Sequence, residues 1–325
     1  MASAAREARL LSDHKKQGER LGCEEEGFFK HEATSGKQTK NTPEAMKFPE
    51  SSQRTEMEES HNPMLLGSEY WNSIAEKLNS YFVKNPCFEH KRNEILRLIN
   101  RWGRNNQDTI VLKTDLYEEA LEPDQLLFSL ARNNRNVYGI DISSQLAKMT
   151  SQKAGREEIR PKLCVADVRR LAFKDDRFDL IISTSTLDHF PEIDVALKEL
   201  YRVLKPKGVI ILTLHNATNL PVYLMYKLMG VFRKYPFGYA EGTYSLWKTK
   251  QLMTSVGFDI EDSTAIIHVL PFLPTIVNGI YRRRHSGILA RICQRIIELS
   301  EIIGKSNSFL KYLTGYCVAV KGTKK

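Results

Sequence analysis

Residues 178–214 read FDLIISTSTLDHFPEIDVALKELYRVLKPKGVIILTL, and this stretch predicts a strand, a helix and a second strand. The run 178–182 is short and almost wholly apolar, which is typical of a strand buried on both faces. Apolar residues at helical spacing follow over 193–204, and Lys205–Gly208 predicts a turn into the second apolar run at 209–212. A helix between two buried strands indicates parallel pairing with a right-handed crossover.

The same alternation continues on both sides of this unit. Further apolar runs and helical patterns lie at 110–112, 124–133, 137–140, 144–154, 163–165, 248–256, 260–269 and 316–320. The predicted fold class is therefore α/β, with a Rossmann-like, doubly wound, mostly parallel seven-stranded sheet and helices on both faces. Two N-terminal helices, over 67–84 and just before Gly103, precede the first strand. A C-terminal helical insertion, with a helix over 287–303, separates the last two strands.

Composition divides the chain near residue 62. Residues 1–62 are rich in Lys, Glu, Ser, Thr, Gln and Asn, and they hold too few apolar side chains to form a core, so we expect a disordered tail. Residues 63–325 are expected to form one domain. We divide it into a helical flank at 63–108, a core at 109–258, and C-terminal strands with their insertion at 259–325.

The charge and cysteine content narrow the functional classes. The formal net charge is +9, but basic residues are spread along the chain, and the one dense basic run is Arg282–His285. That run predicts a solvated face or, alternatively, a contact with an anionic membrane surface or an acidic partner. Basic residues are not interleaved with aromatic ones, so a nucleic-acid partner is not favoured.

Five cysteines without a Cys-x-x-Cys pair suit neither a disulfide framework nor a zinc site, so no metal is expected and a reducing compartment is inferred. We found no stretch long enough to span a membrane and no pattern of a secretory signal or mitochondrial presequence. The expected location is the cytoplasm.

The residues that end the predicted strands are the candidate binding residues, because ligands of doubly wound sheets bind at the carboxyl ends of the strands. Asp141 ends the second strand and could either cap the following helix or accept both hydroxyls of a ribose. Asp167, after the third strand, could accept the exocyclic amine of adenine. Together the two carboxylates predict an adenosine pocket, which makes 109–258 the expected nucleoside-binding core.

Three stretches carry a resemblance to a known family: VYGIDIS at 137–143, VADVRRLAFKDDRFDLIISTSTLDHF at 165–190 and ALKELYRVLKPKGVIILTL at 196–214. They resemble the class I S-adenosylmethionine-dependent methyltransferase superfamily, in particular its branch that modifies small molecules and quinone-like lipids. The resemblance covers residues 110–257 and implies S-adenosyl-L-methionine as cofactor. It implies that the cofactor-binding residues are Thr114, Asp115, Asp141, Ile142, Asp167, Val168 and Ser185.

The turn after the first strand departs from the family pattern. Family members have an acidic, glycine-rich D-x-G-x-G turn, whereas Lys113–Ala120 contains no glycine. Either the turn is remodelled, with Asp115 or Glu118 reaching the ammonium of the cofactor, or the pocket has lost its ligand. Two functions follow: methyl transfer to a small, lipophilic or aromatic acceptor, or a catalytically inactive domain acting as an interaction or scaffold module.

Three residues at the expected mouth of the pocket are catalytic candidates. His189 and His215 could each act as a base or make one structural hydrogen bond. Asp188 could orient His189 or cap the following helix. Residues 220–245 are rich in Tyr, Phe, Leu and Met, which predicts either a packed helix and loop or an apolar pocket for the acceptor. Leu270–Pro274, with Arg282–Arg284, could form an edge for peripheral membrane contact.

Overall fold

The computed structural model describes residues 67–103, 107–123, 125–134, 136–229, 242–269, 273–283, 287–305 and 309–325. The chain divides into two units, residues 1–65 and 66–325, and the following description concerns the second. The predicted disordered tail at 1–62 lies outside the described residues, as do 230–241, 270–272 and 284–286 from the segments proposed for acceptor and membrane contact.

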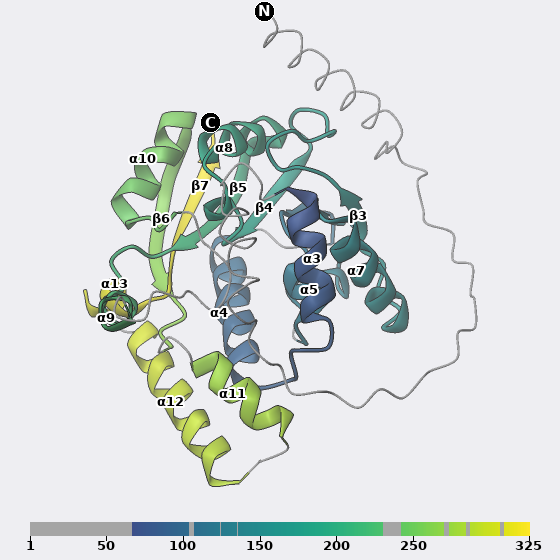
Figure 1. Ribbon diagram of the computed structural model, residues 1–325. Coiled ribbons are helices and arrows are strands. Elements are labelled where there is room, and N and C mark those ends of the chain that lie inside the picture. Colours follow the sequence, from purple (N-terminus) through teal and green to yellow (C-terminus); the bar gives the residue numbers. More distant parts are fainter. Residues whose placement is uncertain are drawn as a thin grey trace, which may run out of the picture. The chain divides into compact units, whose positions relative to one another are not determined.

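A seven-stranded sheet forms the centre of the domain, in the order β3-β2-β1-β4-β5-β7-β6 (Figure 1). Its strands are β1 (Val111–Lys113), β2 (Val137–Asp141), β3 (Lys162–Val165), β4 (Phe178–Thr184), β5 (Leu204–His215), β6 (Phe258–Ile266) and β7 (Cys317–Lys324). Strands β1 to β5 pair in parallel, and β7 is antiparallel to both of its neighbours. This arrangement confirms the predicted fold class.

Helices cover both faces of the sheet because each face buries its own apolar cluster. One cluster joins the sheet to α3 (Ser68–Leu78), α4 (Pro86–Trp102), α5 (Tyr117–Leu121), α6 (Leu126–Ala131) and α7 (Ser144–Arg156). The other joins it to α8 (Ile193–Val203) and α10 (Leu246–Val256). The polar N-terminal flank is thus held to the domain by the first cluster, through α3 and α4.

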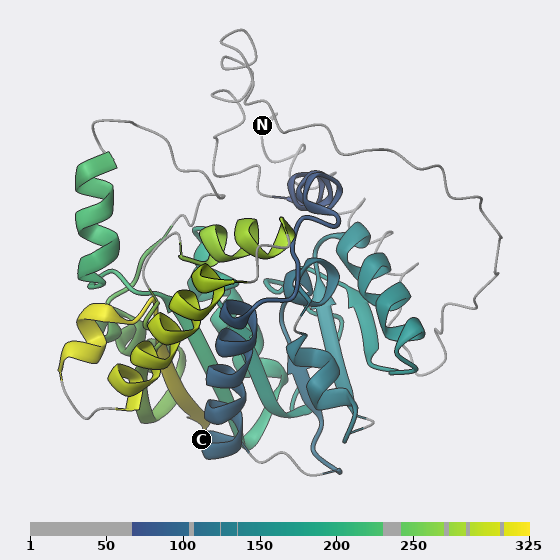
Figure 2. The same ribbon diagram turned by 90° about the horizontal axis from the view of Figure 1, so that it is seen from below.

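The C-terminal insertion lies between β6 and β7 and consists of α11 (Leu273–Arg282), α12 (Ile288–Lys305) and α13 (Leu310–Thr314) (Figures 1 and 2). A third apolar cluster attaches it to α4 and contains Cys87 of α4, Val277 of α11, and Cys293 and Ile297 of α12. Two further elements complete the fold: the 3-10 helix η2 (Leu187–His189) after β4, and α9 (Leu220–Met229) after β5.

Two glycines mark boundaries that the sequence predicts. Gly257 ends α10 in the left-handed region at φ 118°, which glycine adopts without strain. The predicted turn at Lys205–Gly208 lies within β5 as an irregularity, since the register with β4 shifts there. A Cβ at Gly208 would lie 2.7 Å from the carbonyl oxygen of Lys205, so this bend requires glycine.

Among the residues that the structure describes, none of the helices combines the length and the apolar character needed to cross a bilayer.

Candidate functional site

A pocket lies at the carboxyl ends of β1 to β4, where the predicted binding residues meet. Its volume is about 100 Å³. Its walls come from Trp71, Thr114, Asp115, Tyr117, Asp141, Ile142, Leu146, Ala166, Asp167, Val168, Arg169, Ser185, Thr186, His189 and Phe190. All seven residues predicted to bind the cofactor line this one pocket. Asp141 and Asp167 therefore lie on the wall of the same pocket.

Asp141 is buried at the end of β2, and both of its carboxylate oxygens accept backbone hydrogen bonds. Oδ2 accepts from the N–H of Leu116 at 2.8 Å, and Oδ1 accepts from the N–H of Ser143 at 2.8 Å. Burial raises the pKa of Asp141 to about 7, although these two hydrogen bonds act to lower it. Ser143, rather than Asp141, caps α7 by accepting from the N–H of Leu146. Asp141 thus joins the first-strand turn to the loop after β2.

Asp167 reaches the same pocket but forms an ion pair with Arg169. The guanidinium of Arg169 donates to Oδ1 through Nε at 3.0 Å and to Oδ2 through Nη2 at 2.7 Å. The backbone N–H of Arg169 also donates to Oδ1 at 2.9 Å. Because a carboxylate oxygen has two lone pairs, Asp167 can accept an amine only by sharing its oxygens with Arg169.

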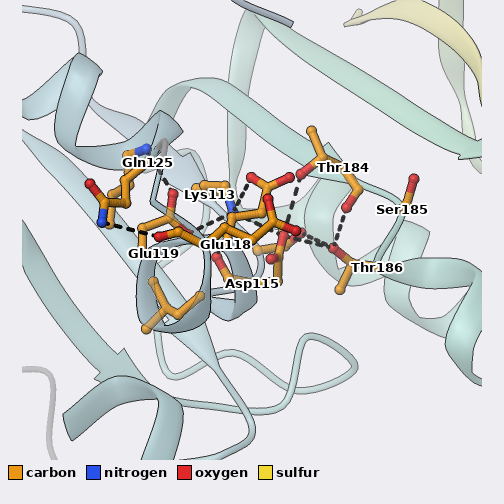
Figure 3. Close-up of polar contacts among 12 residues, drawn as sticks. Lys113, Asp115, Glu118, Glu119, Gln125, Thr184, Ser185 and Thr186 are labelled. Atoms are coloured by element: carbon orange, nitrogen blue, oxygen red, sulfur yellow. Dashed lines mark hydrogen bonds and ion pairs between the residues drawn. The ribbon is translucent and has the colours of Figure 1, made fainter. Parts of the chain in front are cut away.

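Lys113 fills the first-strand turn, where the family pattern has an acidic residue and glycines (Figure 3). Its side chain is fully buried, and its Nζ lies 3.1 Å from Oδ2 of Asp115, 3.1 Å from Oε2 of Glu119 and 3.5 Å from Oε2 of Glu118. Nζ also donates to the carbonyl oxygen of Asp115 at 2.8 Å. Burial alone would lower the pKa of Lys113, but the three carboxylates outweigh it and raise the pKa above its usual value. Lys113 is therefore charged.

The turn is helical, a feature that the sequence reasoning missed. Helix α5 begins at Tyr117, and its carboxylates contact groups on neighbouring elements as well as Lys113. Oε1 of Glu119 accepts from the N–H of Leu127 at 2.8 Å, and Oε1 of Glu118 lies 2.9 Å from Nζ of Lys91 on α4. A buried ion cluster, rather than glycine, thus fixes this turn.

Asp115 is the acidic residue of this cluster that also faces the pocket. Its Oδ2 accepts from Oγ1 of Thr186 at 3.2 Å (Figure 3). Oγ1 of Thr114 lies 3.1 Å from the same Thr186 oxygen. Of the two acids considered for the cofactor's ammonium, Asp115 lines the pocket, whereas Glu118 faces Lys91 and Lys113.

The loop after β4 carries a strained residue on the pocket wall. Ser185 adopts φ 49°, a conformation that is uncommon for residues other than glycine. It is held there because its N–H donates to the carbonyl oxygen of Thr213 at 2.9 Å, and its Oγ lies 3.3 Å from Sγ of Cys317. Such outliers persist where surrounding contacts over-determine them, which is common at binding sites.

Asp188 pairs with His215, and the neighbouring His189 also acts on it electrostatically. Oδ2 of Asp188 accepts from the backbone N–H of His215 at 2.9 Å and also contacts Nδ1 of its ring. Asp188 is fully buried, and its Oδ1 has no hydrogen-bond partner among the described residues. Burial acts to raise the pKa of Asp188, but the neighbouring His215 outweighs it and the pKa is lowered. The alternative that Asp188 caps the following helix, α8, is wrong, because Glu192 occupies the N-cap position of α8.

His189 lines the pocket, and His215 lies behind it. The ring centroids of the two histidines are 6.1 Å apart. His189 packs edge-on against Trp71 of α3 at 5.2 Å, and His215 packs edge-on against Tyr316 at 5.0 Å. Asp188 and His215 are therefore brought together next to the pocket without forming its wall.

Several wall residues were not singled out from the sequence. Trp71 lies on α3, which was expected only as part of the helical flank, and Tyr117 lies on α5, which was not predicted. Both reach the pocket only through tertiary packing. Arg169 and Thr186 lie within the stretch 165–190 that resembles the family. Their closeness in sequence to predicted binding residues was the one signal that could have identified them. Lys113 could be found as a departure from the pattern, but its burial could not.

Comparisons with known proteins agree with this geometry. Residues 123–212 match a family described as Methyltransferase domain. Demethylmenaquinone methyltransferases of Staphylococcus aureus strains JH9 and Newman are each 36% identical over 103 residues, which are 31% of this chain and 42% of the relative. The chain thus matches less than half the length of these curated relatives. The [4+2]-cyclase SpnF superposes with a TM-score of 0.53 at 15% identity, covering 79% of this chain and 94% of that chain.

The family match covers 123–212 of the predicted core and makes this segment similar to a methyltransferase domain, in agreement with the resemblance that the motifs carry. The likeness to SpnF bears on the fold alone, because one fold can host unrelated reactions.

Proposed function

We propose that this protein transfers a methyl group from S-adenosylmethionine to a small, lipophilic or aromatic acceptor. The observation that carries the proposal is the convergence of Asp141 and Asp167 on one pocket at the carboxyl ends of the strands. The matching relatives are named as methyltransferases of a quinone-like compound, which supports an acceptor of this class.

The residues present fit the nucleoside part of the cofactor. Each oxygen of Asp141 accepts one backbone hydrogen bond and keeps a second lone pair, so the carboxylate can still accept two ribose hydroxyls. Asp115 faces the pocket and is the acid placed to hold an ammonium group, sharing its carboxylate with Lys113. The pocket of about 100 Å³ is smaller than the ~300–1,000 Å³ typical of ligand sites, so binding requires its walls to open. Trp71 on α3 is the wall that belongs to the N-terminal flank.

When bound, S-adenosylmethionine supplies a methyl group on a sulfonium leaving group. The protein's own contribution is to orient the acceptor, exclude water and, where the acceptor carries a proton, remove it. Asp188 contacts Nδ1 of His215, and when that nitrogen carries the proton of the ring, Nε2 is the proton acceptor. His189 lies on the wall itself and is the alternative base. Trp71, Tyr117 and Phe190 give the pocket the apolar surface that an aromatic acceptor would contact.

Methyl transfer from labelled S-adenosylmethionine to a demethylated quinone tests this function. We expect turnover by the full chain. His215→Gln should lower turnover by about 10²–10⁴-fold if His215 is the base, without changing cofactor affinity. His189→Gln is the matched variant, and a larger loss there would assign the base to His189. No transfer to any quinone or aromatic acceptor, despite cofactor binding, would refute the proposed acceptor class.

A second function is favoured by the ion cluster in the first-strand turn. The side chains of Lys113 and Glu119 occupy volume where a glycine turn leaves the backbone open. A domain that binds no cofactor would act as an interaction or scaffold module. Cofactor binding by the purified chain distinguishes the two functions.

The cytoplasmic location, the lack of a nucleic-acid role and a peripheral membrane contact remain predictions at this point.

A further inference from the structure

Helix α12 has two apolar sides, and only one of them is covered by described residues. Cys293, Ile297 and Ser300 are buried on the inner side, in and beside the cluster that attaches the insertion to α4. The outer side exposes a stripe of five apolar residues: Ile288 (69% exposed), Ile292 (49%), Leu299 (61%), Ile302 (65%) and Ile303 (37%). Their spacing places them on one face of the helix. A helix that is apolar on both sides is normally covered on both sides.

Neighbouring elements extend this exposed surface. Helix α13 contacts both α12 and α9, and Figures 1 and 2 show the three on one side of the domain. Among the side chains that the structure describes there, the exposed apolar ones are Phe309, which precedes α13, Leu310 on α13, and Leu220, Tyr223 and Leu224 on α9. We call the outer stripe of α12 together with these five residues the docking face. Exposed apolar residues gathered on neighbouring helices indicate an interaction site on a protein.

The docking face is tied to the site through the end of β5. Asn216, just after β5, donates from Nδ2 to the carbonyl oxygens of Tyr312 and Gly315, at 2.8 and 2.9 Å. Asn219, at the start of α9, donates to the carbonyl oxygens of Thr314 and Gly315, at 3.0 and 2.7 Å. Because β5 and β6 run parallel, α9 and the insertion leave the sheet at the edge where the pocket lies.

The charge around the docking face indicates its partner. The described residues of α11 to α13 and the linkers beside them carry six basic side chains, at 282, 283, 291, 295, 305 and 311, against two acidic ones, at 298 and 301. Arg291 and Arg295 border or interrupt the apolar stripe itself. Two copies of so basic a face would repel each other, whereas an anionic bilayer combines apolar and negative surface.

We propose that the docking face binds the surface of an anionic lipid bilayer, with α12 lying in the plane of the interface. The apolar stripe enters the boundary between headgroups and acyl chains, and the arginines contact lipid phosphates. The docking face differs from the membrane edge that the sequence predicts at Leu270–Pro274 and Arg282–Arg284. Residues 270–272 and 284 of that edge lie outside the described residues. The delivery of a lipophilic acceptor from the bilayer to the pocket rests on the proposed function; the docking itself does not.

Sedimentation of the full chain with vesicles tests the docking. We expect binding to vesicles of phosphatidylcholine mixed with phosphatidylserine, weaker binding to phosphatidylcholine alone, and a decrease as salt is added. The triple variant Ile288→Ser, Leu299→Ser, Ile302→Ser should lower the lipid partition coefficient by at least about tenfold, since each buried apolar side chain contributes to insertion. Arg291→Gln with Arg295→Gln should lose the preference for anionic vesicles.

Trp247→Ser is the matched control, because Trp247 is 69% exposed but lies on α10, outside the docking face. It should bind vesicles as the unaltered chain does. Equal loss in both variants, or no anionic-lipid binding by a folded chain, overturns the proposal. A triple variant that shifts from dimer to monomer in analytical ultracentrifugation, with no lipid binding before or after, would assign the face to a second copy. Titration of the cofactor without lipid does not depend on vesicle binding. A failure of the proposed enzyme function is therefore distinguished from a failure of the docking proposal.

Discussion

The buried Lys113 stabilises the first-strand turn in a different way from the glycines found there in the methyltransferases that the chain resembles. A glycine turn is permissive, since it lets a ligand approach the backbone, whereas a fully buried ammonium must be compensated by charge. Asp115, Glu118 and Glu119 provide that compensation within 3.5 Å. The cluster therefore makes the turn rigid before any ligand arrives, and it leaves Asp115 shared between the lysine and the pocket.

Replacing Lys113 by Met should lower the free energy of unfolding by about 3–5 kcal/mol, because buried carboxylates would lose their cation. Chemical denaturation measures this change. Adding Glu119→Gln to Lys113→Met should recover part of the loss. Lys198→Met is the control, since Lys198 forms an exposed pair with Asp194 on α8 and should change stability by less than about 1 kcal/mol. Equal changes in the free energy of unfolding at 113 and 198 would show that the buried ion cluster stabilises the domain no more than an exposed ion pair does.

The raised pKa of Asp141 predicts a pH dependence of cofactor affinity. Ribose hydroxyls favour the ionised carboxylate, so below pH 7 binding must first release the proton that the buried Asp141 holds. The affinity for S-adenosylhomocysteine should therefore be constant above about pH 7 and fall by up to about tenfold per pH unit below it. For the free domain, Asp141 has the opposite effect: its contribution to the free energy of unfolding declines as pH rises from about 4 to 7, because the native state retains this proton.

Calorimetric titration at several pH values measures this affinity. Asp141→Asn should bind more weakly and lose the dependence near pH 7. Asp194→Asn, an exposed substitution on α8, should keep the profile of the unaltered chain. A profile that is identical in the Asp141→Asn variant would show that another group controls binding.

At the scale of elements, the strands and long helices follow from the sequence, but α5 does not. The apolar runs of β2, β4 and β5 are recognisable because they are buried on both faces, and α7 and α12 have a clear helical period. Helix α5 has only five residues, and its carboxylates look like surface positions until their partners Lys113 and Lys91 are known. The pairing of Asp188 with His215 was missed for a similar reason, since it joins two strand ends 27 residues apart.

Space for the remodelled turn comes from Gly139 on β2. A Cβ there would lie 2.7 Å from Cδ2 of Leu116 and 2.9 Å from Cδ2 of Leu127. Gly139→Ala should therefore destabilise the domain by about 1–3 kcal/mol through overpacking. Gly279→Ala is the matched variant, because nothing lies within 4 Å of its position inside α11. It should stabilise by about 0.5–1 kcal/mol. Thermal unfolding of both variants measures the difference, and the same sign in both would contradict this packing.

At the scale of the whole domain, the sequence predicted which residues meet but not how tightly the site is closed. Strand ends of a doubly wound sheet gather at one edge, so the seven residues from Thr114 to Ser185 were bound to lie near each other once the strand order held. The small pocket volume depends on Trp71, Tyr117 and Arg169, whose side-chain positions come from packing across the flank and the loops. No local pattern encodes those contacts.

The central claim is that a turn fixed by a buried lysine still leaves a working cofactor site around Asp141. The most direct test is calorimetric titration of the full chain with S-adenosylhomocysteine at pH 8. We expect saturable binding to one site, and a free energy of unfolding raised by about 2.7 kcal/mol at 100 times the dissociation constant. Asp141→Ala should abolish both effects. A folded chain that releases no heat and gains no stability would contradict the claim and leave the methyltransferase fold with an interaction role.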